Sequence, residues 1–323
     1  MSESSQASDP YALLGIVRNP DGTITFDRTK FPRVPPTPDA VVSKDFRVNY
    51  SKSTYMRLYV PTTALNGGVS SMKLPLVVYF HGGGFINDSY DHEPVHHFCN
   101  LMALKLNVVV ASASYRQAPQ FKLPAAYDDG LYALKWIKNS PDKGWIKSYA
   151  DLSDVFLMGT NSGGNVAYNV GIRFTEEDLT PLCIRGLILL DPFFGGEERC
   201  ESELRHVNDQ VFPPALTDLC WKLCLPDGAD RDHEYSNPRM GEGPEIMQEM
   251  AGFRWKVMVT GEGGGAMIDR QRDVANLMKE NGVYVIEHFT DGDGHGGDPN
   301  KTETMFASIK SLIYSSPPVG FVF

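Results

Sequence analysis

The stretch from Val155 to Tyr168 reads VFLMGTNSGGNVAY, and the rest of the chain is organised around it. It opens on apolar residues, reaches Gly159, and passes through small and polar residues to a helical pattern that begins near Gly164. An apolar run that stops at glycine and gives way to helical spacing is typical of a buried strand, a sharp turn and a helix. The sequence therefore predicts a strand, turn and helix at this point.

This turn resembles the nucleophile elbow of the α/β-hydrolase fold, whose motif is G-x-S-x-G. In that elbow the serine lies strained at the end of a strand, with its side chain exposed above a helix N-terminus. Here the same frame reads Gly159, Thr160, Asn161, Ser162, Gly163. We therefore predict an elbow in which Asn161 stands at the nucleophile position in place of serine.

A frame shifted by one residue would make Ser162 the nucleophile instead. That frame puts Thr160 where the tight turn needs glycine, and it lengthens the exit from the strand by one residue. In an elbow, the residue after the nucleophile normally donates its backbone N–H to the oxyanion hole. We therefore interpret Ser162 as such a donor. A chance loop of Gly, Ser and Asn is the plain alternative to an elbow.

The composition bounds the class of protein. The 323 residues are 42% hydrophobic and 22% charged, an ordinary globular composition with enough length for a large core. A formal net charge of -10 disfavours nucleic acid or an anionic membrane as the main partner. The chain shows no secretory signal and no apolar run near the roughly 20 residues that span a bilayer. We expect a soluble cytoplasmic protein, with the nucleus as a second compartment; the oligomeric state stays open.

The cysteines and histidines do not form a recognisable metal motif. Five cysteines, an odd number without C-x-x-C spacing, favour reduced thiols over a disulfide framework. The run DHEPVHH at residues 91–97 is typical of a solvated loop that enters a helix, although a weak metal site stays open as the alternative. We expect no metal and no cofactor.

The remaining sequence alternates between strand and helix signals. Residues 1–45 are rich in proline, aspartate and serine, which predicts an irregular N-terminal segment, a candidate lid. Residues 46–323 are expected to form one α/β domain, with a helical cap inserted at about residues 193–238. The expected strands are Lys44–Tyr50, Thr54–Val60, Leu74–Phe80, Asn107–Ser112, the run from Val155, Arg185–Leu190, Trp255–Thr260 and Val283–Phe289; the expected helices are Pro94–Leu106, Asp128–Asn139, Ile268–Asn281 and Lys301–Tyr314.

A second motif, His81-Gly82-Gly83-Gly84, follows directly on the strand LPLVVYF. Consecutive glycines let backbone N–H groups approach an anionic oxygen, which is the oxyanion-hole chemistry of lipases and esterases. A simple glycine turn would explain the motif alone. An elbow about eighty residues later, at the end of another strand, makes the oxyanion hole the better interpretation.

Four segments together, HGGGF, YRQAPQFKLPAAYDD, GTNSGGN and LPDGADRDHEYSNP, resemble the plant carboxylesterase family. That family belongs to the hormone-sensitive-lipase-like α/β-hydrolases and is related to the gibberellin receptor and to carboxylesterase-like cyclases and dehydratases. The resemblance runs from about Lys44 to Tyr314. It implies an α/β-hydrolase fold, with a mostly parallel central sheet flanked by helices and a small-molecule pocket, and it does not by itself imply one activity.

The resemblance also assigns the site. It places oxyanion donors on Gly83, Gly84 and the backbone of Ser162, and the nucleophile on Asn161. It places the acid on Gly265, in the loop GEGGGAM, and the histidine on His295, in DGDGHGG. A histidine in a glycine-rich loop is often only solvated, but this one follows the last strand, where the triad order ends.

The acid that would orient His295 has several candidate substitutes. Glu262, Asp269 and Asp293 are acidic residues of this region, and Asp191 ends a sheet strand on the side where the elbow opens. Asp191 also precedes a proline, which is typical of a residue that caps a turn. Asp191 is therefore a possible substitute acid with a structural role as the alternative.

Three functions follow from these assignments. An amide is not a useful nucleophile, so hydrolysis through an acyl-enzyme is disfavoured. The first hypothesis is a lyase, cyclase or isomerase that acts on an apolar plant specialised metabolite through the oxyanion donors and His295. The second is a binding protein or receptor without turnover, and the third is a weak carboxyl ester hydrolase. The retained histidine favours an enzyme.

Overall fold

The central sheet contains eight strands among the residues that the structure describes. The computed structural model describes residues 9–26, 32–66, 72–139, 144–241, 243–291 and 299–315. The strands of the sheet, in chain order, are β3 (Val41–Asn49), β4 (Thr54–Pro61), β5 (Leu74–Phe80), β6 (Val109–Ala113), β7 (Ala150–Thr160), β8 (Ile184–Leu190), β9 (Lys256–Glu262) and β10 (Tyr284–Thr290). Their order across the sheet is β10-β9-β8-β7-β5-β6-β4-β3.

The sheet is mostly parallel. β3 pairs with β4, and β4 with β6, in antiparallel register. All pairs from β6 across to β10 are parallel. The opening antiparallel pair and the parallel remainder confirm the predicted α/β-hydrolase fold.

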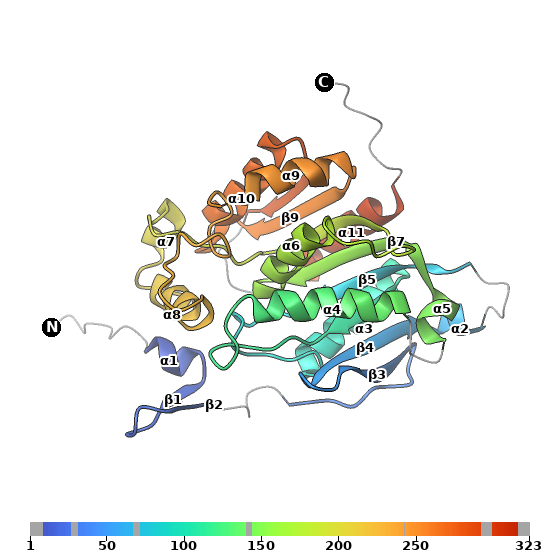
Figure 1. Cartoon of the computed structure of the whole chain (residues 1–323), viewed down its shortest axis with the longest axis horizontal. Helices are drawn as coiled ribbons and strands as arrows, with labels where there is room; N and C mark the ends of the chain where they lie inside the picture. Colours follow the sequence, from blue (N-terminus) through green and yellow to red (C-terminus); the bar gives the residue numbers. More distant parts are fainter. Residues whose placement is uncertain are drawn as a thin grey trace.

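Helices cover both faces of this sheet (Figure 1). One face carries α4 (Ala125–Asn139), α6 (Ser162–Phe174), α9 (Gly243–Gly252) and α10 (Ile268–Glu280), whose apolar side chains share one hydrophobic cluster. The other face carries α3 (Glu93–Leu106) and α11 (Pro299–Tyr314), which share a second cluster. Short helices α2 (Thr62–Asn66) and α5 (Trp145–Tyr149) lie in the connections.

The strand sequences explain this three-layer arrangement. In β5, Leu76, Val78 and Phe80 enter the cluster on the α4 and α6 face. Val77 and Tyr79, which alternate with them, enter the cluster on the α3 and α11 face. Because successive side chains of a strand point to opposite faces, a continuous apolar run is suited to a sheet that is buried on both sides.

The N-terminal segment contains regular structure, so the expectation of an irregular segment to residue 45 is wrong for its described part. It begins with α1 (Pro10–Leu13) and a hairpin of β1 (Ile16–Arg18) and β2 (Ile24–Phe26), and β3 already starts at Val41. Proline at the first position of α1 is compatible with a helix because the first N–H has no helical acceptor.

Tertiary packing also holds this segment in place. Leu14 and Ile16 are buried in the same hydrophobic cluster as Leu216 and Leu219, which belong to the cap. The cap contains α7 (Glu201–Arg205) and α8 (Pro214–Cys224), and α1 lies next to α8 (Figure 1). Apolar contacts with the cap therefore outweigh the proline-rich composition. A lid role for the segment and the domain limits stay predictions.

The parallel strands bring their C-terminal ends to one edge of the sheet. β5 ends at Phe80, β7 at Thr160, β8 at Leu190, β9 at Glu262 and β10 at Thr290. In open α/β sheets, ligands bind in the crevice beyond this edge. The predicted site residues all follow one of these strand ends in the sequence.

Candidate active site

Asn161 occupies the sharp turn between β7 and α6. Its backbone has φ 54° and ψ -120°, a conformation that L-residues rarely adopt. Backbone hydrogen bonds hold it there: Asn161 N–H donates to Leu190 O at 2.9 Å, and Asn161 O accepts from Phe193 N–H at 3.0 Å and from the first turn of α6. The turn is therefore fixed by the end of β8, by the residues that follow β8 and by the start of α6.

The two glycines that flank this turn have no room for a side chain. A Cβ atom at Gly159 would lie 2.0 Å from Gly163 O. A Cβ atom at Gly163 would lie 2.0 Å from Phe80 O, at the end of β5. These close approaches bracket Asn161 symmetrically, as the spacing of an elbow requires.

Ser162 begins α6, and its side chain is fully buried. The shifted frame would require glycine at position 160. The residue there is Thr160, whose Oγ1 accepts a hydrogen bond from Tyr79 Oη at 3.1 Å. A nucleophile has to be exposed to substrate, so both observations favour the frame that is centred on Asn161. The backbone N–H of Ser162, as the first of the helix, has no helical acceptor and is free for an oxyanion.

The HGGG motif faces the elbow. Gly83 has φ 95° and Gly84 has φ 61°, and a Cβ atom at these positions would lie 2.0 Å from Asn87 O and 2.8 Å from Cys220 Sγ, respectively. The backbone N–H of Gly84 donates a hydrogen bond to Asn161 Oδ1 at 3.3 Å. The structure thus brings two segments about eighty residues apart into direct contact, and the amide oxygen of Asn161 lies where an N–H donor reaches it.

Sequence reasoning missed Tyr115, which braces this motif. Its hydroxyl donates to His81 O at 2.8 Å, and its ring stacks on the His81 imidazole with centroids 4.4 Å apart. His81 Nδ1 lies 2.9 Å from Gly82 O, a contact that needs a proton on Nδ1, and burial lowers the pKa of His81. A neutral, buried imidazole therefore shapes the backbone. The only sequence signal was that Tyr115 opens the YRQAPQF segment used for the resemblance.

The acid side of the site lies at the ends of β8 and β9. Gly265, the predicted acid position, lies in a turn in which its N–H donates to Glu262 O at 2.8 Å. Asp191 follows β8 with φ 44°, and its N–H donates to Thr260 Oγ1 at 3.0 Å. Burial and the Glu262 carboxylate raise the pKa of Asp191 to about 6, although a hydrogen bond from the Thr260 hydroxyl opposes them.

In the sequence, Asp191 lies between Leu190 and Phe193, whose backbones form hydrogen bonds with the backbone of Asn161. A carboxyl group whose pKa approaches neutrality can act as a proton donor or acceptor. His295, the predicted histidine, lies outside the described residues, as does Asp293. Asp269, in contrast, accepts a hydrogen bond from Ser202 N–H at 2.7 Å in the cap.

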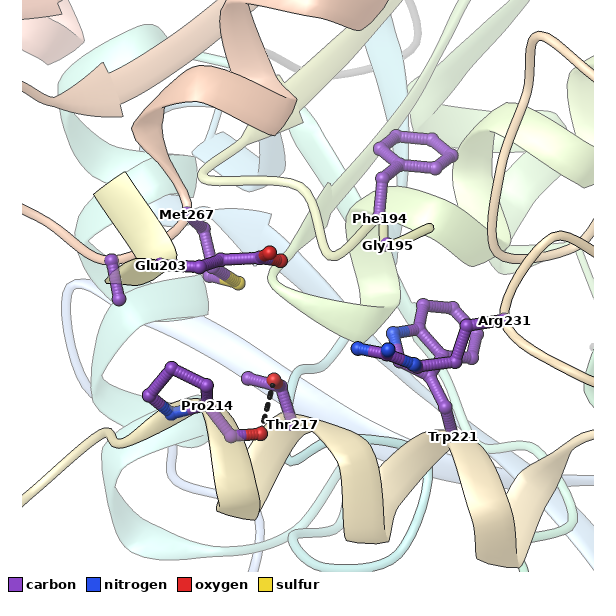
Figure 2. A pocket seen from close by; sticks show the side chains of 9 residues that line it. Phe194, Gly195, Glu203, Pro214, Thr217, Trp221, Arg231 and Met267 are labelled. Atoms are coloured by element: carbon purple, nitrogen blue, oxygen red, sulfur yellow. Dashed lines mark hydrogen bonds between the residues drawn. The ribbon is translucent and has the colours of Figure 1, made fainter. Parts of the chain in front are cut away.

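A small pocket lies between α8 and the loops that follow β8 and β9 (Figure 2). Glu203 and Met267 lie on one side of it, and Trp221 and Arg231 lie across from them. Phe193 connects the pocket to the elbow, because its ring stacks on Trp221 with centroids 4.5 Å apart. The other lining residues are Phe194, Gly195, Pro214, Thr217 and Ala266.

The charged groups of this pocket are already paired. Glu203 contacts Arg270 at 3.2 Å, and Arg231 contacts Asp218 at 2.6 Å. Trp221 Nε1, in contrast, is buried without a hydrogen-bond partner in the described part of the chain. The space that these residues enclose is about 10 Å³, which is room for a single water molecule and not for a substrate.

A family profile described as the α/β-hydrolase fold matches residues 77–297. The chain belongs to this α/β-hydrolase family. Carboxylesterase 20 of Arabidopsis thaliana is 58% identical to it over 98% of this chain and 99% of its own. The 3-O-acetylpapaveroxine carboxylesterase CXE2 of Papaver somniferum is 39% identical over 95% of this chain and 100% of its own. These relatives confirm the resemblance to plant carboxylesterases.

A solved esterase of Pyrobaculum calidifontis has the same fold as this α/β-hydrolase, with a TM-score of 0.69 at 22% identity over 88% of each chain. Among the described residues, no helix has the length and apolar character needed to cross a bilayer. Within the same residues, no cluster of three or more His, Cys, Asp or Glu side chains is arranged to hold a metal ion.

Proposed function

We propose that this carboxylesterase-like protein catalyses a non-hydrolytic reaction, a lyase, cyclase or isomerase step, on an apolar small molecule. The observation that carries the proposal is the contact of 3.3 Å between Gly84 N–H and Asn161 Oδ1. A carboxamide cannot form a hydrolysable acyl ester, so the elbow does not supply a nucleophile. The donor beside it is nevertheless retained, and a donor aimed at a carbonyl oxygen stabilises negative charge there.

The proposed reaction begins when a substrate carbonyl oxygen replaces Asn161 Oδ1 as the acceptor of the Gly84 N–H. The N–H groups of Gly83 and Ser162 add to this oxyanion hole, which makes a proton next to the carbonyl more acidic. His295 takes that proton as general base, and the enolate then expels a leaving group or closes a ring. Such proton transfer contributes about 10² to 10⁴ in rate.

Asp191 is proposed as the substitute for the acid that Gly265 lacks. Two features support the assignment: Asp191 lies next to the backbone contacts of the elbow, and its pKa is raised to about 6. A carboxylate there would hold the imidazole of His295 in one tautomer while the proton moves. The structural alternative, that Asp191 only caps its turn, makes an opposite prediction for stability, which is developed in the Discussion.

The substrate is proposed to bind beyond the C-terminal ends of the parallel strands, where Gly84 and Asn161 meet. The name of the Papaver somniferum relative contains 3-O-acetylpapaveroxine, an O-acetylated compound, which supports an oxygenated substrate class for this chain.

Ester hydrolysis is the second candidate, because both relatives are named as carboxylesterases. A fluorophosphonate probe distinguishes the two, since it labels an activated serine. We expect no stoichiometric labelling of the wild type and near-background turnover of p-nitrophenyl esters. The double variant Asn161→Ser with Gly265→Asp is the positive control, because it restores both a serine at the elbow and a carboxylate at the acid position. Labelling of Ser162 in the wild type would restore the shifted frame and overturn the proposal.

Turnover itself is tested by incubating the protein with a metabolite extract of plant tissue and following substrate loss and product gain by mass spectrometry. We expect a product that is isomeric with its substrate or differs by loss of a small leaving group, and no product with His295→Ala. A compound that binds and is recovered unchanged would instead support a binding protein without turnover.

A further inference from the structure

We propose that Asn161 is a self-modification site, at which the side-chain amide cyclises onto the backbone nitrogen of Ser162 and is then hydrolysed to aspartate. The proposal rests on two independent observations. The first is the ψ angle of -120° at Asn161, and the second is the hydrogen bond that its amide oxygen accepts from Gly84 N–H. It does not depend on the lyase proposal.

The backbone geometry prepares the ring. The Cβ of an L-residue is rotated by about 120° from its own nitrogen around the Cα–C bond, because the Cα is tetrahedral. A ψ of -120° therefore eclipses the Cβ of Asn161 with the nitrogen of Ser162. The five-membered imide contains both atoms and needs this eclipsed arrangement. Residues in helices, with ψ about -42°, and in strands, with ψ about +135°, hold the two atoms apart.

The elbow also activates the carbon that is attacked. Gly84 N–H donates to Asn161 Oδ1, so negative charge that develops on this oxygen in a tetrahedral intermediate is stabilised. The attacking nitrogen is available because Ser162 is the first residue of α6, and its N–H has no helical acceptor. The positive end of the helix favours the anionic nitrogen and the carboxylate product alike.

The two steps balance without an oxidant or reductant. The Ser162 nitrogen forms a bond to Asn161 Cγ, the Cγ–Nδ2 bond breaks, and ammonia leaves with the proton from the Ser162 N–H. Water then adds to Cγ, the bond from Cγ to the Ser162 nitrogen breaks, and that nitrogen regains a proton. One water is consumed and one ammonia is released. Because Gly84 N–H polarises the Cγ carbonyl, water attacks there and the product is aspartate with an intact main chain.

The proposed product, aspartate at position 161, would give the elbow a nucleophile. A carboxylate at the elbow is a competent nucleophile, which a carboxamide is not. Aspartate at position 161 would therefore restore covalent chemistry to a site that is synthesised without it. Asn161 is only partly buried, so the water that the second step consumes can reach the site.

The test compares two asparagines by peptide mapping of protein incubated at mildly alkaline pH, folded and in urea. Asn281 precedes Gly282, which leaves the attacking nitrogen unobstructed in a flexible chain, but in the fold its ψ is 18°. In urea we expect Asn281 to convert first. In the folded protein we expect the order to reverse, with Asn161 converting about tenfold faster than in urea. Slower conversion of Asn161 in the folded than in the unfolded chain would overturn the proposal.

Hydroxylamine tests the ring, because it cleaves a chain at an imide. We expect fragments that separate after residue 161 from folded wild type, and none at this position from Asn161→Gln, whose longer side chain would have to close a six-membered ring. Circular dichroism of Asn161→Gln confirms that the control is folded. Aspartate formation without any cleavage product would mean direct hydrolysis by water and would contradict cyclisation.

Discussion

The elbow and the acid side of the site differ in how their geometry is held. At the elbow, backbone atoms approach so closely at Gly159 and Gly163 that no side chain fits. On the acid side, Gly265 has no carboxyl group, and the proposed substitute, Asp191, forms its hydrogen bonds with one threonine, Thr260. A geometry made of backbone contacts does not depend on which side chain position 161 carries, because the same contacts also join β5, β7 and α6. A geometry that depends on side chains changes whenever those side chains are replaced.

The largest effect should come from restoring side chains to the preserved backbone. The double variant Asn161→Ser with Gly265→Asp is expected to raise p-nitrophenyl ester hydrolysis about 10³-fold or more over the wild type, and each single change should give much less. The reason is that triad members act as a unit. A Cβ at Gly265 would lie 3.1 Å from Glu262 O, so a small adjustment accommodates the aspartate.

The control for this experiment is the double variant combined with His295→Ala, which should return activity to the background of the wild type. The folded double variant could also stay inactive towards short acyl esters. In that case one carboxylate at position 265 is not enough to restore the acid side, and the acid side differs from that of an esterase by more than this one residue.

The next effect concerns stability. Gly163→Ala places a Cβ 2.0 Å from Phe80 O, so β5 and α6 must separate, and we expect a loss of about 3 kcal/mol or more in the free energy of unfolding. Gly252→Ala is the matched control, because a Cβ there meets nothing within 4 Å. Denaturant unfolding should show Gly252→Ala unchanged or slightly stabilised. Equal effects of the two variants would contradict the claim that backbone contacts fix the elbow.

The sequence predicted the backbone-built region better than the region built by side chains. Glycine spacing located the turn at Asn161 and the close backbone approaches at Gly83 and Gly84, because positions without room for a Cβ admit only glycine. It could not predict the contact between Gly84 N–H and Asn161 Oδ1, or the brace from Tyr115, since both depend on how distant strands are registered. The order within the N-terminal segment was missed for a similar reason, as it comes from packing on α8.

The smallest effect distinguishes a functional Asp191 from a structural one. The pKa of Asp191 is raised from 3.8 to about 6, so the folded protein keeps its proton where the unfolded chain has lost it. Wild-type stability from this group therefore falls as pH rises from about 4 to 6, and the loss is complete above that window. If Asp191 transfers protons as proposed, this loss of stability is the cost of a functional group, as is common at functional sites.

Asp191→Asn removes the free-energy cost of holding an ionised carboxylate in a buried position. Asn also tolerates the φ of 44° at this position. We expect the variant to be more stable than the wild type by about 1 to 2 kcal/mol at pH 7, with no difference near pH 3. Asp129→Asn is the matched control, because Asp129 is buried and paired with Arg116 at 2.7 Å, and its loss should destabilise. Urea unfolding from pH 3 to 8 measures both. If Asp191 only caps its turn, Asp191→Asn would lower the free energy of unfolding at every pH from 3 to 8. That result would contradict the assignment of Asp191 as the substitute acid.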